Sequence, residues 1–125
     1  MTIKKIIIDT NALLAISEFK LDLFEELKQF LDFNFTIHVI SSTILELEKI
    51  KLEQRGKYKL AASIALQLIK TKNINIIKKD GFVDDLLVEL SKEENLILTQ
   101  DIALKKRLQK PYLTIRQKKK IILVK

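Results

Sequence analysis

The segment Lys4-Lys5-Ile6-Ile7-Ile8-Asp9 decides the fold class of this chain of 125 residues. Its three consecutive isoleucines are typical of a strand that is buried on both faces, as the central strands of parallel sheets are. Asp9 ends the run, so a carboxylate follows the strand directly. The segment therefore predicts a central parallel strand with an acidic side chain at its carboxyl end.

Further strands and helices alternate along the chain. Apolar spacing predicts helices at residues 21–33, from residue 43, and at residues 57–70, 83–94 and 102–109. Apolar and β-branched runs predict strands at residues 36–40, 73–78, 96–98, 113–115 and 121–124. Thr43, with Glu46 three residues later, is a candidate capping box for the helix that begins there.

This alternation predicts an α/β fold, with three layers (α/β/α) and a central, mostly parallel sheet. The sequence has no linker, repeat or low-complexity segment. We therefore expect residues 1–125 to form a single domain.

The composition excludes several classes of protein. The chain has no cysteine, so disulfides, thiolate catalysis, zinc fingers and iron–sulfur clusters are excluded together. Residues 1–8 are too short for a signal peptide, and no apolar run approaches the roughly 20 residues that a membrane helix requires. We expect a cytoplasmic protein that has no membrane partner.

Basic residues are concentrated in the C-terminal part of the chain. The formal net charge is +7, and after Asp101 the chain has nine basic residues and no acidic one. The preceding residues contain all 16 acidic residues and the other 14 basic residues. This basic C-terminal segment, about residues 102–125, predicts a polyanionic partner, and nucleic acid is the first candidate. A solvated basic face is the alternative.

Acidic residues follow four successive predicted strands. They are Asp9, Glu46, the pair Asp84 and Asp85, and Asp101. Because the carboxyl ends of parallel strands meet at one edge of a sheet, we expect these side chains to lie close together. Helix capping explains any one of them, but capping does not require an acid after all four strands. Gathered carboxylates repel one another unless a cation lies among them, and oxygen ligands without His or Cys suit Mg²⁺ or Mn²⁺.

Four segments in order resemble the motifs of the PIN domain family. The opening motif resembles Ile6-Ile7-Ile8-Asp9-Thr10-Asn11-Ala12-Leu13-Leu14, and the second, acidic motif is similar to residues 41–47, which end in Leu45-Glu46-Leu47. The third resembles Val83-Asp84-Asp85-Leu86-Leu87, and the fourth resembles Leu98-Thr99-Gln100-Asp101 with Leu104-Lys105-Lys106-Arg107-Leu108. The sequence is most similar to compact archaeal PIN proteins related to the eukaryotic endonuclease of the small-subunit processome.

The resemblance implies a metal-dependent endoribonuclease that hydrolyses RNA phosphodiesters. Its catalytic and metal-binding residues would be Asp9, Glu46, Asp84 and Asp101, around one or two Mg²⁺ or Mn²⁺ ions. By the same analogy Asp9 is the central ligand, Asp84 and Asp101 complete the site, and Glu46 orients the attacking water. Thr10, Asn11 and Thr99 would hold the carboxylates in place. The basic residues expected to bind RNA are Lys105, Lys106, Arg107, Arg116, Lys118 and Lys119.

Two of these assignments stay open. Helical periodicity places Asp85 with solvated residues, so Asp84 is the favoured ligand of the two. For the second acid, periodicity places Glu48 within the apolar stripe of its helix. Position in the first turn and the family motif favour Glu46 instead.

Three functions are compatible with the sequence. The first is a ribonuclease of ribosomal RNA processing or RNA turnover, with ribosome-assembly factors as partners. The second is a VapC-type toxin whose cleavage an antitoxin blocks. The third is a PIN-fold RNA-binding scaffold without catalysis, and retention of all four acids argues against it. The apolar helix at residues 60–69 is compatible with a homodimer interface and equally with a core helix.

Overall fold

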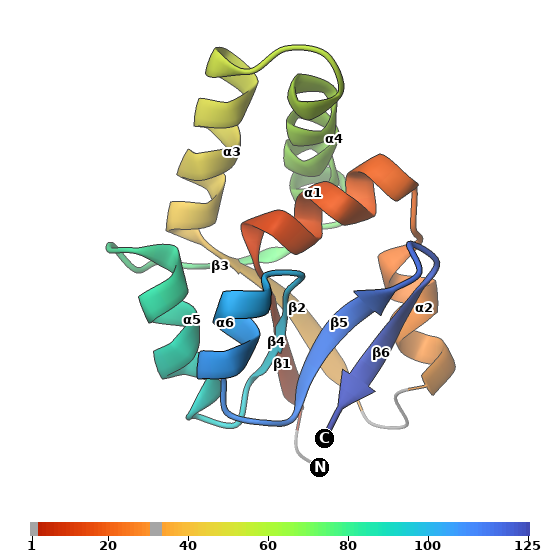
Figure 1. Ribbon diagram of the computed structural model, residues 1–125, viewed down its shortest axis with the longest axis vertical. Helices are drawn as coiled ribbons and strands as arrows, with labels where there is room; N and C mark the ends of the chain where they lie inside the picture. Colours follow the sequence, from red (N-terminus) through yellow and green to blue (C-terminus); the bar gives the residue numbers. More distant parts are fainter. Residues whose placement is uncertain (1–2, 31–33) are drawn as a thin grey trace.

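In the described residues, 3–30 and 34–125, a computed structural model shows a six-stranded sheet between two layers of helices (Figure 1). The strands are β1 (Lys4–Ile8), β2 (Phe35–Ile40), β3 (Asn75–Ile77), β4 (Leu96–Leu98), β5 (Tyr112–Arg116) and β6 (Lys120–Val124). Their order is β3-β2-β1-β4-β5-β6, and every neighbouring pair is parallel except β5 and β6. The mostly parallel sheet and its two helical layers confirm the predicted fold class.

Within the same ranges, six helices connect the strands. They are α1 (Thr10–Phe19), α2 (Leu23–Phe30), α3 (Ser41–Glu53), α4 (Lys57–Thr71), α5 (Val83–Ser91) and α6 (Ile102–Arg107). Helix α1 was not among the predicted helices, although its buried residues Ala12, Leu13 and Ile16 recur at helical spacing. Of the helix predicted at residues 21–33, residues 31–33 lie outside the described residues.

The isoleucines of β1 pack on the two faces of the sheet in alternation. Ile6 and Ile8 belong to the larger apolar core, together with buried residues of α1, α2 and α4. Ile7 belongs to the second core, with Leu87 of α5 and Leu104 of α6. All three isoleucines are fully buried, so β1 is covered on both faces, as its composition predicts.

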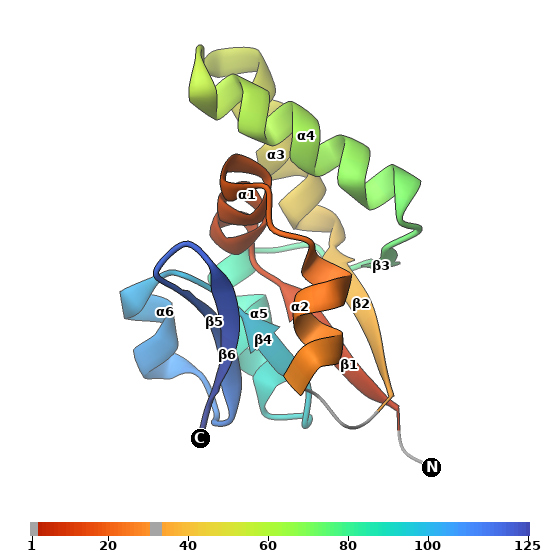
Figure 2. The same ribbon diagram turned by 90° about the vertical axis from the view of Figure 1, so that its right-hand side faces the viewer.

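The helix pair α3 and α4 projects beyond the carboxyl ends of the strands. In Figures 1 and 2 this pair lies at the upper end of the molecule, and the start of β1 and the end of β6 lie at the lower end. Helix α4 buries Ala62 and Ala65 in the core and exposes Leu60 and Ile64. The helix therefore has a core face and also an apolar solvent face. None of the helices in the described ranges has the length and apolar character needed to cross a membrane.

Candidate active site

Asp9 and Thr99 are neighbours because of the register between β1 and β4. Ile8 of β1 pairs with Leu98 of β4, and the Asp9 N–H donates to the Leu98 carbonyl at 2.9 Å. The next residue on each strand therefore lies at the same point of the carboxyl edge. There the Thr99 hydroxyl donates to Asp9 Oδ2 at 2.8 Å, and Asp9 is only 3% exposed. The sheet itself brings the first predicted acid and a predicted supporting hydroxyl together.

Two of the predicted acids also cap helices. Asp9 Oδ1 accepts the N–H of Thr10 at 2.7 Å at the start of α1, and Asp101 Oδ1 accepts the N–H of Leu104 at 3.1 Å at the start of α6. The N-cap residues of α3 and α5 make no side-chain cap, and neither of them is an acid. Capping therefore accounts for Asp9 and Asp101 in part, but it does not account for the acids on α3 and α5.

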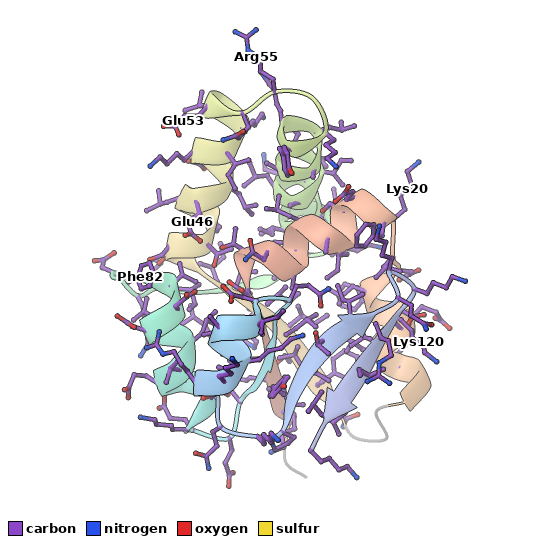
Figure 3. The ribbon with its side chains drawn as sticks, in the orientation of Figure 1. Lys20, Glu46, Glu53, Arg55, Phe82 and Lys120 are labelled. Atoms are coloured by element: carbon purple, nitrogen blue, oxygen red, sulfur yellow. The ribbon has the colours of Figure 1, made fainter. Side chains whose placement is uncertain are left out.

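Glu46 extends from α3 toward the start of α1, where the Thr10 hydroxyl donates to its Oε1 (Figure 3). The predicted capping box is wrong, because α3 begins at Ser41 and its N-cap is Ile40. Thr43 is buried in the core and its hydroxyl has no hydrogen-bond partner among the described residues, while the Glu46 carboxylate accepts a hydrogen bond from Thr10. Glu46 therefore bonds to a residue of another helix instead of to the start of its own helix.

Glu48, the alternative to Glu46, lies elsewhere on α3. Its side chain is exposed and lines a groove between α3 and α4 together with Lys51 and Leu66. Of the two candidates for the second acid, the structure therefore brings only Glu46 to the residue beside Asp9. The apolar residues near Glu48 on the helical wheel therefore mark the groove between α3 and α4, and they do not mark the edge of the sheet where Asp9 lies.

Asp84 and Asp85 face different partners at the start of α5. Asp85 is exposed, and the Arg107 guanidinium donates to its Oδ1 at 2.7 Å. Asp84 is half-buried, and burial raises its pKa. The negative charge of Asp101 raises that pKa further, whereas the positive charge of Arg107 lowers it. Asp84 is thus the residue of the pair whose pKa is raised by another predicted acid, Asp101.

We call Asp9, Glu46, Asp84 and Asp101 the acidic edge. The pKa of Asp9 is raised from 3.8 to about 6, and burial is the largest cause. The hydrogen bonds from Thr99 and from the Thr10 amide lower that pKa, and repulsion by Asp84 and Glu46 raises it again. Since Asp84 is repelled by Asp101 in turn, the four acids form one connected series of interacting negative charges.

The donors of the acidic edge fit a hard divalent cation by their chemistry. They are carboxylate oxygens supported by hydroxyls, and His38, the only histidine, instead contacts Thr36 within β2. Within the described ranges, no three His, Cys, Asp or Glu side chains lie close enough together to share one ion. The site therefore fits a divalent cation in two respects: its donors are carboxylate oxygens, and a cation would relieve the repulsion between them.

The residues predicted to support the acids differ in their contacts. Thr10 and Thr99 each donate to an acid, as described above. Asn11 is exposed on the first turn of α1, and no bond from it to the acidic edge is found in the described part of the chain. Gln100 was missed. Its Oε1 accepts the N–H of Ile115 at 2.7 Å and the hydroxyl of Thr114 at 2.8 Å, which ties the loop before Asp101 to β5. Its place between Thr99 and Asp101 was the available signal.

The residues predicted to bind RNA lie in two places. Lys105, Lys106 and Arg107 form the last turn of α6, and Arg116, Lys118 and Lys119 lie at the turn between β5 and β6. Lys118 Nζ lies 5.3 Å from the centre of the Phe19 ring, so this turn contacts the end of α1. Arg107 is engaged with Asp85, whereas Arg116 and Lys119 are exposed.

Known proteins match nearly the whole chain. A family model for a PIN-like domain matches residues 6–118. The chain is 33% identical to Ribonuclease VapC4 of Methanocaldococcus jannaschii over 123 residues, 92% of each protein. It is 31% identical to Ribonuclease VapC9 of Archaeoglobus fulgidus over 103 residues, 81% of this chain and 73% of that protein. The structure of the PIN domain endonuclease Utp24 is similar, with a TM-score of 0.73 and 28% identity, covering 95% of this chain and 90% of that one.

Proposed function

The chain belongs to the PIN-like domain family, and we propose that it is a metal-dependent endoribonuclease that hydrolyses RNA phosphodiesters. One observation carries this proposal: the buried carboxylate of Asp9 is repelled by the charges of both Glu46 and Asp84, at an edge where four elements each supply an acid. The similarity to two proteins named ribonucleases and to a PIN domain endonuclease supports nuclease activity.

In this proposal, Asp9 would be the central ligand of Mg²⁺ or Mn²⁺. Asp84 and Asp101 would complete the site directly or through bound water, since no three acidic side chains of the described residues are placed to hold one ion together. Such an ion, when bound, lowers the pKa of water and offsets negative charge on the phosphoryl group. Glu46 orients the attacking water through Oε2, because its Oε1 accepts the Thr10 hydroxyl. Thr99 holds Asp9 through its hydroxyl, and the same hydroxyl accepts the N–H of Asp101 at 3.1 Å.

Basic residues around the acidic edge would hold the phosphate backbone of the RNA. Lys105 and Lys106 lie on the helix that Asp101 caps, so they are close in the chain to a predicted metal ligand. Arg116 and Lys119 lie at the turn that contacts Phe19, at the opposite end of α1 from the end that Asp9 caps. Binding at both places would draw a polyanion across the acids, which repel it in the absence of a cation.

A second candidate is a toxin ribonuclease that an antitoxin protein restrains. The two VapC ribonucleases similar to this chain favour it. A small protein encoded beside the gene that binds this chain and blocks cleavage would establish the toxin. Without such a neighbour, ribosomal RNA processing or general RNA turnover is the better account.

Cleavage of an end-labelled RNA of mixed structure tests the proposed function. The purified protein is incubated with Mn²⁺, with Mg²⁺ and with EDTA, next to Asp9→Asn. We expect cleavage with at least one of the two ions, none in EDTA, and none by the variant. Binding of the RNA without cleavage in either ion would contradict the proposal and favour the scaffold function.

A further inference from the structure

Large apolar side chains are exposed beside three of the four acids of the acidic edge. Leu45 precedes Glu46, Phe82 lies two residues before Asp84, and Ile102 follows Asp101. Their exposed fractions are 64%, 64% and 71%. A single exposed apolar residue needs no explanation, but each of these three lies on an element that also carries one of the acids. Three of the four acids thus have an exposed apolar neighbour in the chain.

The loop that carries Phe82 is anchored on α3. The hydroxyls of Ser41 and Ser42 each donate to the Lys79 carbonyl at 3.0 Å, and the Lys79 N–H donates to Ser41 Oγ at 3.1 Å. These bonds hold the loop against the first turn of α3, shortly before Glu46 in the chain. Figure 3 shows Phe82 and Glu46 on the same flank of the molecule.

The backbone at Phe82 is fixed as well. Gly81 has a φ of +136°, a conformation that residues with side chains rarely adopt. Directly after it, the Phe82 carbonyl accepts the N–H of Leu86 at 3.1 Å and closes the first turn of α5. The ring therefore extends from a defined backbone position.

The acids and the basic residues would contact the phosphates of an RNA strand, but they leave its bases without a partner. Lysine and arginine contact phosphates, and carboxylates with a cation would act on the scissile phosphate. Neither group contacts the face of a base. An aromatic ring does so by stacking, which is independent of charge and therefore unaffected by the negative acidic edge.

We propose that Phe82 is a base-stacking residue of this site, and that Leu45 and Ile102 complete the apolar surface around the stacked nucleotide. The proposal rests on the ribonuclease function proposed above. The nucleotide on Phe82 has to leave the stack of its neighbours. Phe82 therefore contributes to the choice of the phosphodiester that reaches the acids.

The first arm of the test measures stacking. Single-stranded RNAs with 2-aminopurine at successive positions are mixed with the protein, with Ca²⁺ in place of Mg²⁺ to slow cleavage. The chain has no Trp, so the fluorescence of the probe base is read without interference. Because the probe base leaves the stack of its neighbours, we expect its fluorescence to change at one or two positions with the wild type and with Phe82→Tyr. We expect no change with Phe82→Leu, which should bind about tenfold more weakly.

The second arm measures cleavage under single-turnover conditions. An RNA that is abasic at the position where the fluorescence changes should be cut about tenfold more slowly by the wild type. Phe82→Leu should cut the intact and the abasic RNA at the same slow rate. Tyr58→Leu removes another exposed aromatic ring, on α4, and should behave as the wild type.

The two proposals fail in different ways. A fluorescence change and an abasic effect that persist in Phe82→Leu would overturn the stacking role, while continued cleavage would leave the ribonuclease function intact. Absence of cleavage by the wild type with either Mg²⁺ or Mn²⁺ would overturn the ribonuclease function itself. Phe82 is mostly exposed, so its replacement is expected to leave folding unchanged, which the thermal unfolding of the variant checks.

Discussion

The buried hydroxyl of Thr99 donates to Asp9 Oδ2 at 2.8 Å, so the end of β4 holds the carboxylate at the end of β1. The same hydroxyl accepts the N–H of Asp101 at 3.1 Å. One side chain thus positions two of the four acids. It also favours the charged form of Asp9, because the bond lowers a pKa that burial has raised.

Thr99→Val retains the branched shape of the side chain and removes its hydroxyl. We expect the single-turnover rate of RNA cleavage to fall about tenfold, because a hydrogen bond to a charged group contributes about 1.5 kcal/mol. Thr99→Ser, which keeps the hydroxyl, should retain most of the rate. If the valine variant cleaves as fast as the wild type, Thr99 does not position the acids.

Asp9 should make the metal-free protein less stable as the pH rises. Its pKa in the folded protein is raised from 3.8 to about 6, so the folded state keeps a proton that the unfolded state releases in this window. The stability contributed by that proton is present below about pH 4 and is lost as the pH rises through 6. The loss amounts to at most about 3 kcal/mol.

Asp9→Asn tests this pH dependence, since the amide keeps the shape and removes the charge. In EDTA the variant should be more stable than the wild type toward urea at about pH 8, and the difference should vanish near pH 4. Urea unfolding at both pH values measures it. A variant that is no more stable at the higher pH would show that the Asp9 carboxylate is not under strain from burial.

A divalent cation should offset the repulsion in the acidic edge. At neutral pH, Mn²⁺ at about 100 times its Kd should stabilise the wild type by about 2.7 kcal/mol and raise its Tm by several degrees. Asp9→Asn should gain much less. Asp85→Asn, which alters an acid paired with Arg107, is the control and should gain as much as the wild type. An equal rise in Tm for Asp9→Asn would place the bound ion elsewhere.

The turn between β5 and β6 should contribute to RNA binding through charge. Replacing Arg116 and Lys119 by alanine should weaken binding and reduce the slope of log K against log salt by about 0.7 for each phosphate that is no longer neutralised. Fluorescence anisotropy over a salt series measures both the affinity and the slope. Lys92→Ala, at the end of α5 and paired with Glu89, is the matched control. A slope unchanged by the double replacement would remove this turn from the RNA interface.

The sequence predicted the parts of the fold that depend on local patterns. The isoleucine run of β1 indicated a strand buried on both faces, and parallel strands necessarily bring their terminal acids to one edge. Helical periodicity places Asp84 on the apolar face of α5 and Asp85 on the solvated face, and it likewise predicted that Asp84 is the more buried of the two.

Interactions between distant segments could not be predicted in the same way. The capping box failed because Thr10, 36 residues away, takes the Glu46 carboxylate. The ion pair of Arg107 with Asp85 and the brace formed by Gln100 depend on how α5, α6 and β5 pack. No local pattern distinguishes Phe82, which is exposed, from the buried Val83 beside it, because burial follows from the packing of α5 on the sheet.

Asp84 and Asp85 offer the most direct test of the central claim, that the acidic edge performs RNA cleavage. They are adjacent in the chain, but the charge of Asp101 acts on Asp84, while Asp85 pairs with Arg107. The measurement is the single-turnover cleavage rate of labelled RNA with Mn²⁺ for Asp84→Asn and Asp85→Asn. We predict a loss of about 100-fold or more for Asp84→Asn and a change within about fivefold for Asp85→Asn. Equal losses, or a larger loss for Asp85→Asn, would contradict the claim.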